Sequence, residues 1–252
     1  TLLTPWGCKV RNKILLGDCM ELLNKVPDGS VDMVLCDLPY GTTNCKWDTI
    51  LPLGELWKHY NRVCKKNAAI VLTAAQPFTS ALIMSNPKYF KYTWVWEKSK
   101  ATGYLNSKKM PMKAHEDVCV FYRKLPTYNP QMVQGTPYDK GKAHRPTDVY
   151  GTQKGEIHVK NTTGLRYPRT VQYFKTAESE GKVYHPTQKP LSLFEYLVKT
   201  YSNPGDLILD NCIGAGTTAL ACIKQERDYI GMELEKKYYD ITLERIEELE
   251  KK

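Results

Sequence analysis

The sequence lacks the arrangements of cysteine and histidine that mark structural metal sites. Its eight cysteines are scattered along the chain, and no Cys-x-x-Cys pair or Cys/His cluster has the spacing of a zinc site. Several cysteines lie in apolar stretches, which favours buried, reduced thiols in a cytosolic protein. We therefore expect neither a metal site nor a disulfide framework.

Long hydrophobic runs are also missing. Residues 67–87 carry no charge, but Gln76, Pro77 and Asn86 break the stretch too often for a membrane span. Residues 1–6 have no charged start and no long apolar stretch, so we expect no targeting segment there. These absences favour a cytoplasmic protein without a membrane partner.

Negative charge is the third deficit. The 252 residues include 36 Lys and Arg against 27 Asp and Glu, which gives a formal net charge of +9. Such an excess attracts polyanions without deciding which one. The length suits one large α/β domain or a domain that carries an insertion.

Short apolar runs alternate with helical patterns along most of the chain. Runs rich in β-branched or aromatic residues predict seven strands, at residues 13–16, 31–36, 69–73, 92–97, 118–122, 206–209 and 229–232. Helical patterns fall between most of them, at residues 20–26, 53–64, 78–84, 191–201, 217–225 and 236–249. Strands that alternate with helices predict an α/β fold with a doubly wound, mostly parallel sheet.

Two loops at predicted strand ends carry the chemistry. Asp37-Leu38-Pro39-Tyr40-Gly41 follows the apolar run 31–36, and a loop with Gly214 and Gly216 follows the run 207–209. The second loop lacks the third glycine of the dinucleotide fingerprint and the Gly-Lys-Ser/Thr ending of a phosphate loop, which disfavours NAD and ATP. Taken alone, the first loop also fits a β-turn. Because open α/β sheets bind ligands at this edge, the pair indicates group transfer from a nucleotide-like cofactor to a planar, amino-bearing base.

Four motifs in a distinctive order resemble those of the N4/N6 amino-methylating DNA methyltransferases. Asp37-Leu38-Pro39-Tyr40 is similar to the catalytic Asp-Pro-Pro-Tyr, and residues 210–218 are similar to the cofactor loop Asp-Pro-Phe-x-Gly-x-Gly-Thr-Thr. His-Pro-Thr-Gln-Lys-Pro stands at residues 185–190, and Gly17-Asp18-Cys19 follows the first predicted strand. With the cofactor loop last, the order is that of the beta class. The resemblance implies a circularly permuted, Rossmann-like methyltransferase fold with seven strands.

The resemblance also implies a cofactor, S-adenosylmethionine. Asp18 matches the residue that accepts a hydrogen bond from the adenine amino group, Glu233 matches the acid that binds the ribose hydroxyls, and Lys189 could pair with the cofactor carboxylate. The cofactor-binding residues that it implies are Asp18, Cys19, Asp37, Lys189, Asp210, Cys212, Gly214, Gly216, Thr217, Thr218 and Glu233. Leu38, Asn211 and Cys212 depart from the family pattern. We expect the loss of the aromatic residue at 212 to weaken an apolar contact with adenosine.

The catalytic residues that we expect are Asp37, Pro39 and Tyr40. An exocyclic amino nitrogen is a poor nucleophile, because its lone pair is delocalised into the ring. Asp37 and the Pro39 carbonyl can each accept one of its N–H groups, which frees the lone pair, and Tyr40 can stack on the extruded base. No metal and no covalent enzyme intermediate are needed.

Residues 123–184 break the alternation and hold eleven Lys or Arg against five Asp or Glu. We interpret this stretch as a target-recognition insertion in a catalytic domain formed by residues 1–122 and 185–252. Arg145, Arg166 and Arg169 are the expected DNA contacts, since phosphate contacts position a protein on DNA. A solvated surface insertion with its own small core is the alternative.

The sequence therefore predicts a site-specific DNA methyltransferase that modifies N6 of a flipped adenine in double-stranded DNA. Asp at the first motif position goes mainly with adenine in this family. N4-cytosine methylation, an RNA- or protein-methylating relative, and a catalytically silent DNA-binding relative are the alternatives. We expect a monomer or homodimer, bacterial or phage-encoded, that works at the nucleoid.

Overall fold

The computed structural model describes residues 11–43, 45, 48–144 and 156–251. The chain forms two compact units. Unit 1 comprises Thr1–Asn129 and Thr170–Lys252, and unit 2 comprises Pro130–Arg169.

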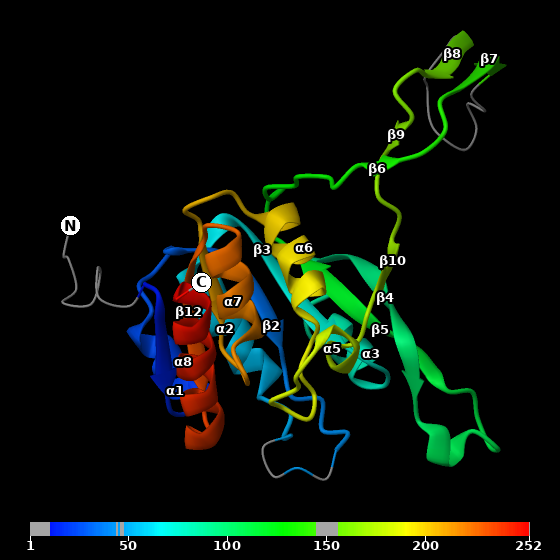
Figure 1. Cartoon of the computed structure of the whole chain (residues 1–252). Helices are drawn as coiled ribbons and strands as arrows, with labels where there is room; N and C mark the ends of the chain where they lie inside the picture. Colours follow the sequence, from blue (N-terminus) through cyan, green and yellow to red (C-terminus); the bar gives the residue numbers. More distant parts are fainter. Residues whose placement is uncertain (1–10, 44, 46–47, 145–155, 252) are drawn as a thin grey trace. The chain divides into compact units, whose positions relative to one another are not determined.

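Unit 1 is built on one central sheet (Figure 1). In spatial order its strands are β1 (Lys13–Leu16), β12 (Asp228–Glu233), β11 (Leu207–Asp210), β2 (Val31–Asp37), β3 (Cys64–Ala74), β5 (Lys113–Phe121), β4 (Phe90–Thr102) and β10 (Val171–Phe174). Only β5 runs antiparallel to its neighbours, β3 and β4. Since β11 and β12 lie between β1 and β2, the last strands of the chain are inserted next to its first strand, inside the sheet.

Helices cover both faces of this sheet, which explains the apolar character of its strands. In β2, Val34 and Cys36 pack into one core, and Met33 and Leu35 pack into the other. The first core is closed by α1 (Cys19–Leu22), the 3₁₀ turn η1 (Leu23–Lys25), α2 (Leu53–Val63) and α3 (Phe78–Ser85). The second is closed by α6 (Leu191–Tyr201), α7 (Thr217–Lys224) and α8 (Lys236–Glu250).

The doubly wound α/β fold predicted from the sequence is confirmed. The predicted strand 13–16 and helix 191–201 have the observed ends, the predicted helix 20–26 is divided into α1 and η1, and the other predicted elements are present with shifted ends. The predicted number of strands is wrong, because β10 makes an eighth. It pairs in parallel with β4 at the edge of the sheet. Together with the short helix α5 (Ala177–Glu180), β10 belongs to unit 1. Unit 2, residues 130–169, is therefore shorter at both ends than the predicted insertion of residues 123–184.

Unit 2 consists of two antiparallel ribbons. β6 (Val133–Gln134) pairs with β9 (Leu165–Arg166), and β7 (Tyr138–His144) pairs with β8 (Glu156–Asn161). Both hydrophobic core clusters consist of residues from unit 1, and in unit 2 Val133, Leu165 and Tyr167 are exposed. Gly164 fits because a Cβ there would come within 2.1 Å of the Gly135 carbonyl oxygen.

Candidate active site

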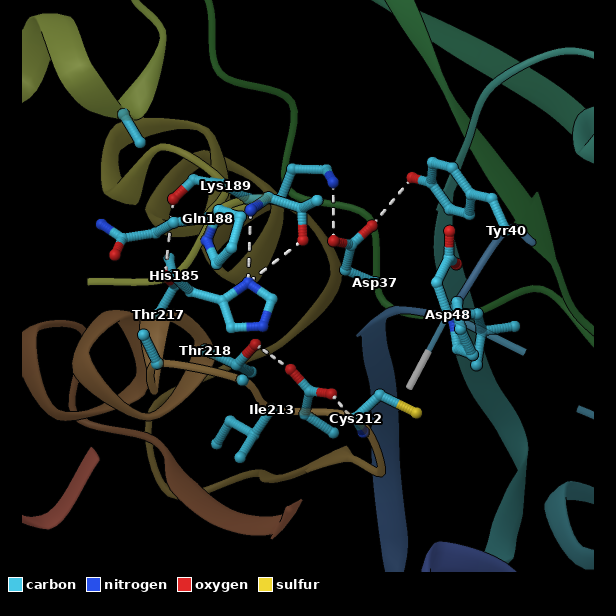
Figure 2. Close-up of a pocket in the computed structure, with 18 of the residues that line it drawn as sticks. Asp37, Tyr40, Asp48, His185, Gln188, Lys189, Cys212, Ile213, Thr217 and Thr218 are labelled. Carbon is cyan, nitrogen blue, oxygen red and sulfur yellow. Dashed lines mark hydrogen bonds and ion pairs between the residues drawn. The ribbon is translucent and has the colours of Figure 1, made fainter. Parts of the chain in front are cut away.

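The loops after four neighbouring strands meet around one cavity of about 630 Å³. Because β1, β12, β11 and β2 are parallel, their carboxyl ends share one edge of the sheet. The cavity is lined there by Asp18, Asp37, Asp210 and Glu233, and also by the segment that contains Lys189. Figure 2 shows Asp37 and Lys189 facing each other in this cavity. The structure thus brings together the two sequence motifs that lie farthest apart in the chain.

Asp37, the last residue of β2, is held by three donors. Its Oδ1 accepts hydrogen bonds from the Tyr40 hydroxyl at 2.8 Å and from the Thr73 hydroxyl. Its Oδ2 forms an ion pair with the Lys189 ammonium at 2.6 Å. An ionised carboxylate oxygen can accept two hydrogen bonds. Among the described residues Lys189 is the one donor to Oδ2, so this oxygen has an open position at the cavity.

Lys189 is buried among carboxylates. Its side chain is 7% exposed, and its ammonium also lies 3.6 Å from Glu116. Burial opposes the charge, but the carboxylates of Asp37 and Glu116 outweigh burial and raise the pKa of Lys189. Lys189 is therefore an ammonium that fixes Asp37. Its predicted contact with the cofactor carboxylate stays a prediction.

Tyr40 and Pro39 line the same cavity. The Tyr40 ring stacks on Phe78 with 5.2 Å between centroids and 21° between planes. Burial raises the pKa of Tyr40, so its hydroxyl remains a proton donor to Asp37. Leu38, which departs from the family motif, is 3% exposed and packs into the core beneath the loop.

Asp210, the last residue of β11, holds the glycine-rich loop between β11 and α7. This carboxylate accepts hydrogen bonds from the Cys212 N–H at 3.0 Å and from the Thr218 hydroxyl. Gly214 and Gly216 have φ values of +55° and +85°, which favour glycine. A Cβ on Gly216 would also lie 2.7 Å from the Thr242 methyl carbon. The loop can therefore bring its backbone close to a ligand.

Glu233 ends β12 on the other side of this loop. Its two carboxylate oxygens accept the N–H groups of Gly214 at 2.9 Å and Glu235 at 2.8 Å. Burial raises the pKa of Glu233 in spite of these hydrogen bonds. The carboxylate both shapes the loop and lines the cavity.

Asp18 and Cys19 form the wall beside β1. Asp18 is exposed at the cavity and caps α1 by accepting the Met20 N–H at 2.7 Å. A hydrogen bond with Cys212, followed by burial, raises the pKa of the Cys19 thiol. The hydrogen bond with Cys19 lowers the pKa of the Cys212 thiol, but a hydrogen bond with Cys36 and burial outweigh it and raise this pKa overall. Both thiols are therefore neutral and line the cavity, with Cys212 at the position where the family has a phenylalanine.

Asn211, the second departure in this loop, has its own partner. It is 1% exposed, and its Oδ1 accepts a hydrogen bond at 2.6 Å from the hydroxyl of Tyr60 on α2. This hydrogen bond connects the loop to α2, a contact that could not be predicted from the family motif.

The structure adds site residues that our sequence analysis missed. Thr73 lies directly beside Asp37 in the β2–β3 register, and a polar residue that ends an apolar strand at the catalytic edge was the available signal. Glu116 and Lys98 extend the charge network, with 3.2 Å between their charged groups. His185 begins the His-Pro-Thr-Gln-Lys-Pro motif and lies 4.2 Å from the Tyr238 ring, and burial lowers its pKa to about 4.

Asp48 closes the loop after the catalytic motif and was also missed. Its buried carboxylate accepts the N–H groups of Gly41, Thr42 and Thr43 at 2.8, 2.9 and 2.6 Å. Burial raises the pKa of Asp48, but these hydrogen bonds outweigh burial and the net shift is downward. The carboxylate therefore stays ionised and sets the shape of the loop.

The predicted DNA contacts belong to unit 2 or lie outside the described residues. The Arg166 guanidinium donates to the Thr136 carbonyl at 3.1 Å and lies 5.8 Å from the centre of the Tyr138 ring. Arg169 ends unit 2. Arg145 falls outside the described residues.

A doubly wound sheet with acidic residues around a glycine-rich loop defines the class of open α/β sheets that bind a nucleotide-like cofactor at this edge. The solved M1.HpyAVI–SAM complex has this fold, with a TM-score of 0.64 and 23% identity, over 93% of this chain and 98% of that one. The cytosine-N4-specific PvuII DNA methyltransferase has it with a TM-score of 0.65 and 16% identity, over 94% of this chain and 90% of that one. At these identities the likeness shows the fold.

The chain belongs to the N6/N4 DNA methylase family, whose model matches residues 31–244. It is similar to the Type II methyltransferase M1.MboII of Moraxella bovis, with 28% identity over 249 residues, 90% of this chain and 93% of that protein. It is also similar to the DNA adenine methyltransferase YhdJ of Escherichia coli (strain K12), with 27% identity over 259 residues, 93% of this chain and 82% of that protein. The predicted family is confirmed, and its cofactor is S-adenosylmethionine.

We predict that Tyr60→Phe destabilises the protein and weakens cofactor binding. The substitution leaves the buried Asn211 Oδ1 without its donor, at a cost of about 1–3 kcal/mol. In a chain of this size each kcal/mol lowers the melting temperature by about 2–4 °C. Thermal unfolding and calorimetry with S-adenosylmethionine measure both effects. Tyr173→Phe, at an exposed tyrosine, is the control, and equal melting temperatures for the two variants would contradict the prediction.

A second prediction concerns pH. Burial raises the pKa of Asp210 from 3.8 to about 7. The folded protein therefore holds a proton that the unfolded chain releases, and the resulting stability is present at acid pH and lost as pH rises through about 7. Asp210→Asn removes this titration. We expect the melting temperature of the wild type, relative to the Asn variant, to fall between about pH 4 and pH 7 and then to level off. A pH-independent difference would contradict the assignment.

Proposed function

We propose that this chain methylates N6 of adenine at a specific site in double-stranded DNA. The observation that carries the proposal is the open acceptor position on Asp37 Oδ2, at a cavity shared with the glycine-rich loop. The Asp-x-Pro-Tyr motif favours adenine, and the name of the relative YhdJ agrees. Methylation of cytosine at N4 is the second candidate, because the PvuII enzyme has the same fold.

The residues around the cavity fit S-adenosylmethionine. The backbone at Gly214 and Gly216 can approach it closely, Asp210 and Thr218 hold the loop, and Thr217 lines the cavity. In the proposal Asp18 accepts from the adenine ring, Glu233 binds the ribose, and Cys19 and Cys212 supply apolar contact. The bound cofactor supplies an electrophilic methyl group on a sulfonium.

Asp37 and Pro39 act on the target amino group. Asp37 Oδ2 accepts one N–H and the Pro39 carbonyl the other, so the nitrogen lone pair is directed out of the ring plane. Tyr40, whose ring is stacked on Phe78, offers a firm surface for the extruded base. Positive charge develops on the nitrogen only during transfer, so Asp37 stabilises the transition state more than the bound substrate.

Unit 2 is proposed to contact the DNA. Its basic residues, Arg166 and Arg169 together with Arg145, would neutralise phosphates and set the register of the protein on the duplex. The relatives come from bacteria, and the proposal therefore includes cytoplasmic action at the nucleoid, as a monomer or homodimer.

The test of the target base is mass spectrometry of digested DNA after reaction with the purified protein. We expect N6-methyladenine. N4-methylcytosine alone would overturn the assignment of adenine, and single-molecule sequencing of DNA from an expressing host would map the recognised site.

The test of the mechanism is Asp37→Ala. We expect turnover to fall by well over tenfold, which corresponds to about 1.4 kcal/mol of barrier, with little change in cofactor affinity. Asp28→Ala is the matched control, since Asp28 precedes β2 at the opposite edge of the sheet and its side chain is 77% exposed. A loss smaller than about tenfold would show that Asp37 is not the transition-state acceptor.

A further inference from the structure

The β4–β5 hairpin of unit 1 extends beyond the sheet. Alongside it, β10 pairs with β4 as far as Lys98 and β3 pairs with β5 as far as Asp117, whereas β4 and β5 continue to pair up to Thr102 and Lys113. Since β4 is parallel to β2, the hairpin projects from the edge where Asp37 ends its strand. Figure 1 shows this projection, with η2 (Tyr104–Asn106) at its tip.

The root of the hairpin is part of the active-site wall. Lys98, Thr102 and Lys113 line the same cavity as Asp37 and Tyr40. Lys98 is anchored by its ion pair with Glu116, which in turn faces Lys189. The hairpin therefore has a fixed position next to the residues that act on the target base.

Its tip presents apolar side chains to solvent on an ordered turn. Leu105 is 96% exposed and Tyr104 is 76% exposed, and Met110 is also exposed. The turn is closed by backbone hydrogen bonds from Asn106 to Gly103, from Ser107 to Tyr104 and from Met110 to Asn106, each at 3.0 Å. Three exposed large apolar side chains within seven residues of an ordered turn favour a binding function.

The charge around this tip fits a polyanion. No acidic residue stands between Lys98 and Glu116, a segment that contains Lys100, Lys108, Lys109 and Lys113. Lys100 pairs with Glu178 at 3.5 Å. Over the described residues no salt bridge involves Lys108, Lys109 or Lys113. Two copies of this basic tip would repel each other, so the charge favours an anionic partner. The exposed apolar side chains favour a partner that also has apolar surface to contact.

We propose that this tip is a wedge that enters the base stack of duplex DNA, with Leu105 beside the target base pair and the lysines at the flanking phosphates. The proposal rests on the proposed function. Extrusion of a base leaves a gap in the stack, and leucine side chains can occupy such a step in DNA complexes. Stacked bases supply the apolar surface for Leu105, and phosphates supply the charge for the lysines. The short distance along the chain from the tip to the cavity wall suits a wedge that acts at the target itself.

The experiment compares Leu105→Ala with Leu125→Ala. Leu125 is 78% exposed and follows β5 at the opposite edge of the sheet, so it is a matched control. Each protein is assayed on two synthetic duplexes that carry the recognition site mapped by sequencing DNA from an expressing host. In one duplex the target adenine is paired with thymine, and in the other an abasic site stands opposite the adenine. Because a paired base must be unpaired and unstacked before it is extruded, we expect Leu105→Ala to lower kcat/KM about tenfold or more on the paired duplex and much less on the abasic one. Leu125→Ala should match the wild type on both.

Three outcomes would overturn the wedge. They are wild-type kinetics for Leu105→Ala on both duplexes, an equal loss on both duplexes, and a change in oligomeric state of Leu105→Ala by analytical ultracentrifugation. The second would make the tip a plain binding contact and the third a contact between copies. A wild-type protein that methylates neither duplex would overturn the proposed function, and the wedge with it.

A second variant tests the charged flank. Lys108→Ala combined with Lys109→Ala should flatten the dependence of DNA affinity on salt, by roughly 0.9 in the logarithmic slope for each phosphate that the variant no longer neutralises. An unchanged slope would show that these lysines do not contact the DNA backbone.

Discussion

The ion pair between Asp37 and Lys189 is the constraint on which the rest of the site depends. It joins the end of β2 to the segment before α6, and its atoms lie 2.6 Å apart with the lysine almost fully buried. The Lys189 carbonyl also accepts from the Thr217 hydroxyl at 3.4 Å, which connects the same segment to the start of α7. A buried charge that loses its partner is strongly destabilising. The pair therefore fixes the catalytic carboxylate against the motif segment, and the Lys189 carbonyl places that segment beside the start of α7.

The order of strands explains how such distant segments meet. The catalytic motif leaves β2 and the glycine-rich loop leaves β11, and these two strands are neighbours that run parallel. Their loops lie side by side at the topological switch point of the sheet, where the connections from neighbouring strands run to opposite sides. Open α/β sheets bind ligands at this point. The arrangement does not require the cofactor loop to come first in the sequence. It requires only that β11 and β12 take their places between β1 and β2.

Periodicity and motifs were sufficient to predict the central strands, the helices and the acidic residues of the site. They were insufficient for elements whose residue types show no apolar pattern that would indicate a strand. β10 has alternating exposure in a Pro- and Gly-rich stretch, and the outer part of the β4–β5 hairpin has lysines in place of an apolar face. The partner of Lys189 could not be predicted either, because sequence spacing does not show which carboxylate a buried lysine meets. Thr73 was missed for the same reason, since its role arises from strand register alone.

The central claim is that Lys189 holds Asp37, and a double-mutant cycle measures this most directly. Unfolding free energies would be compared for the wild type, Asp37→Asn, Lys189→Met and the double variant. If the two side chains act as a pair, the double variant loses less stability than the sum of the single variants, by at least about 1 kcal/mol. Additivity within about 0.5 kcal/mol would contradict the account, because it would mean that the two charges do not depend on each other.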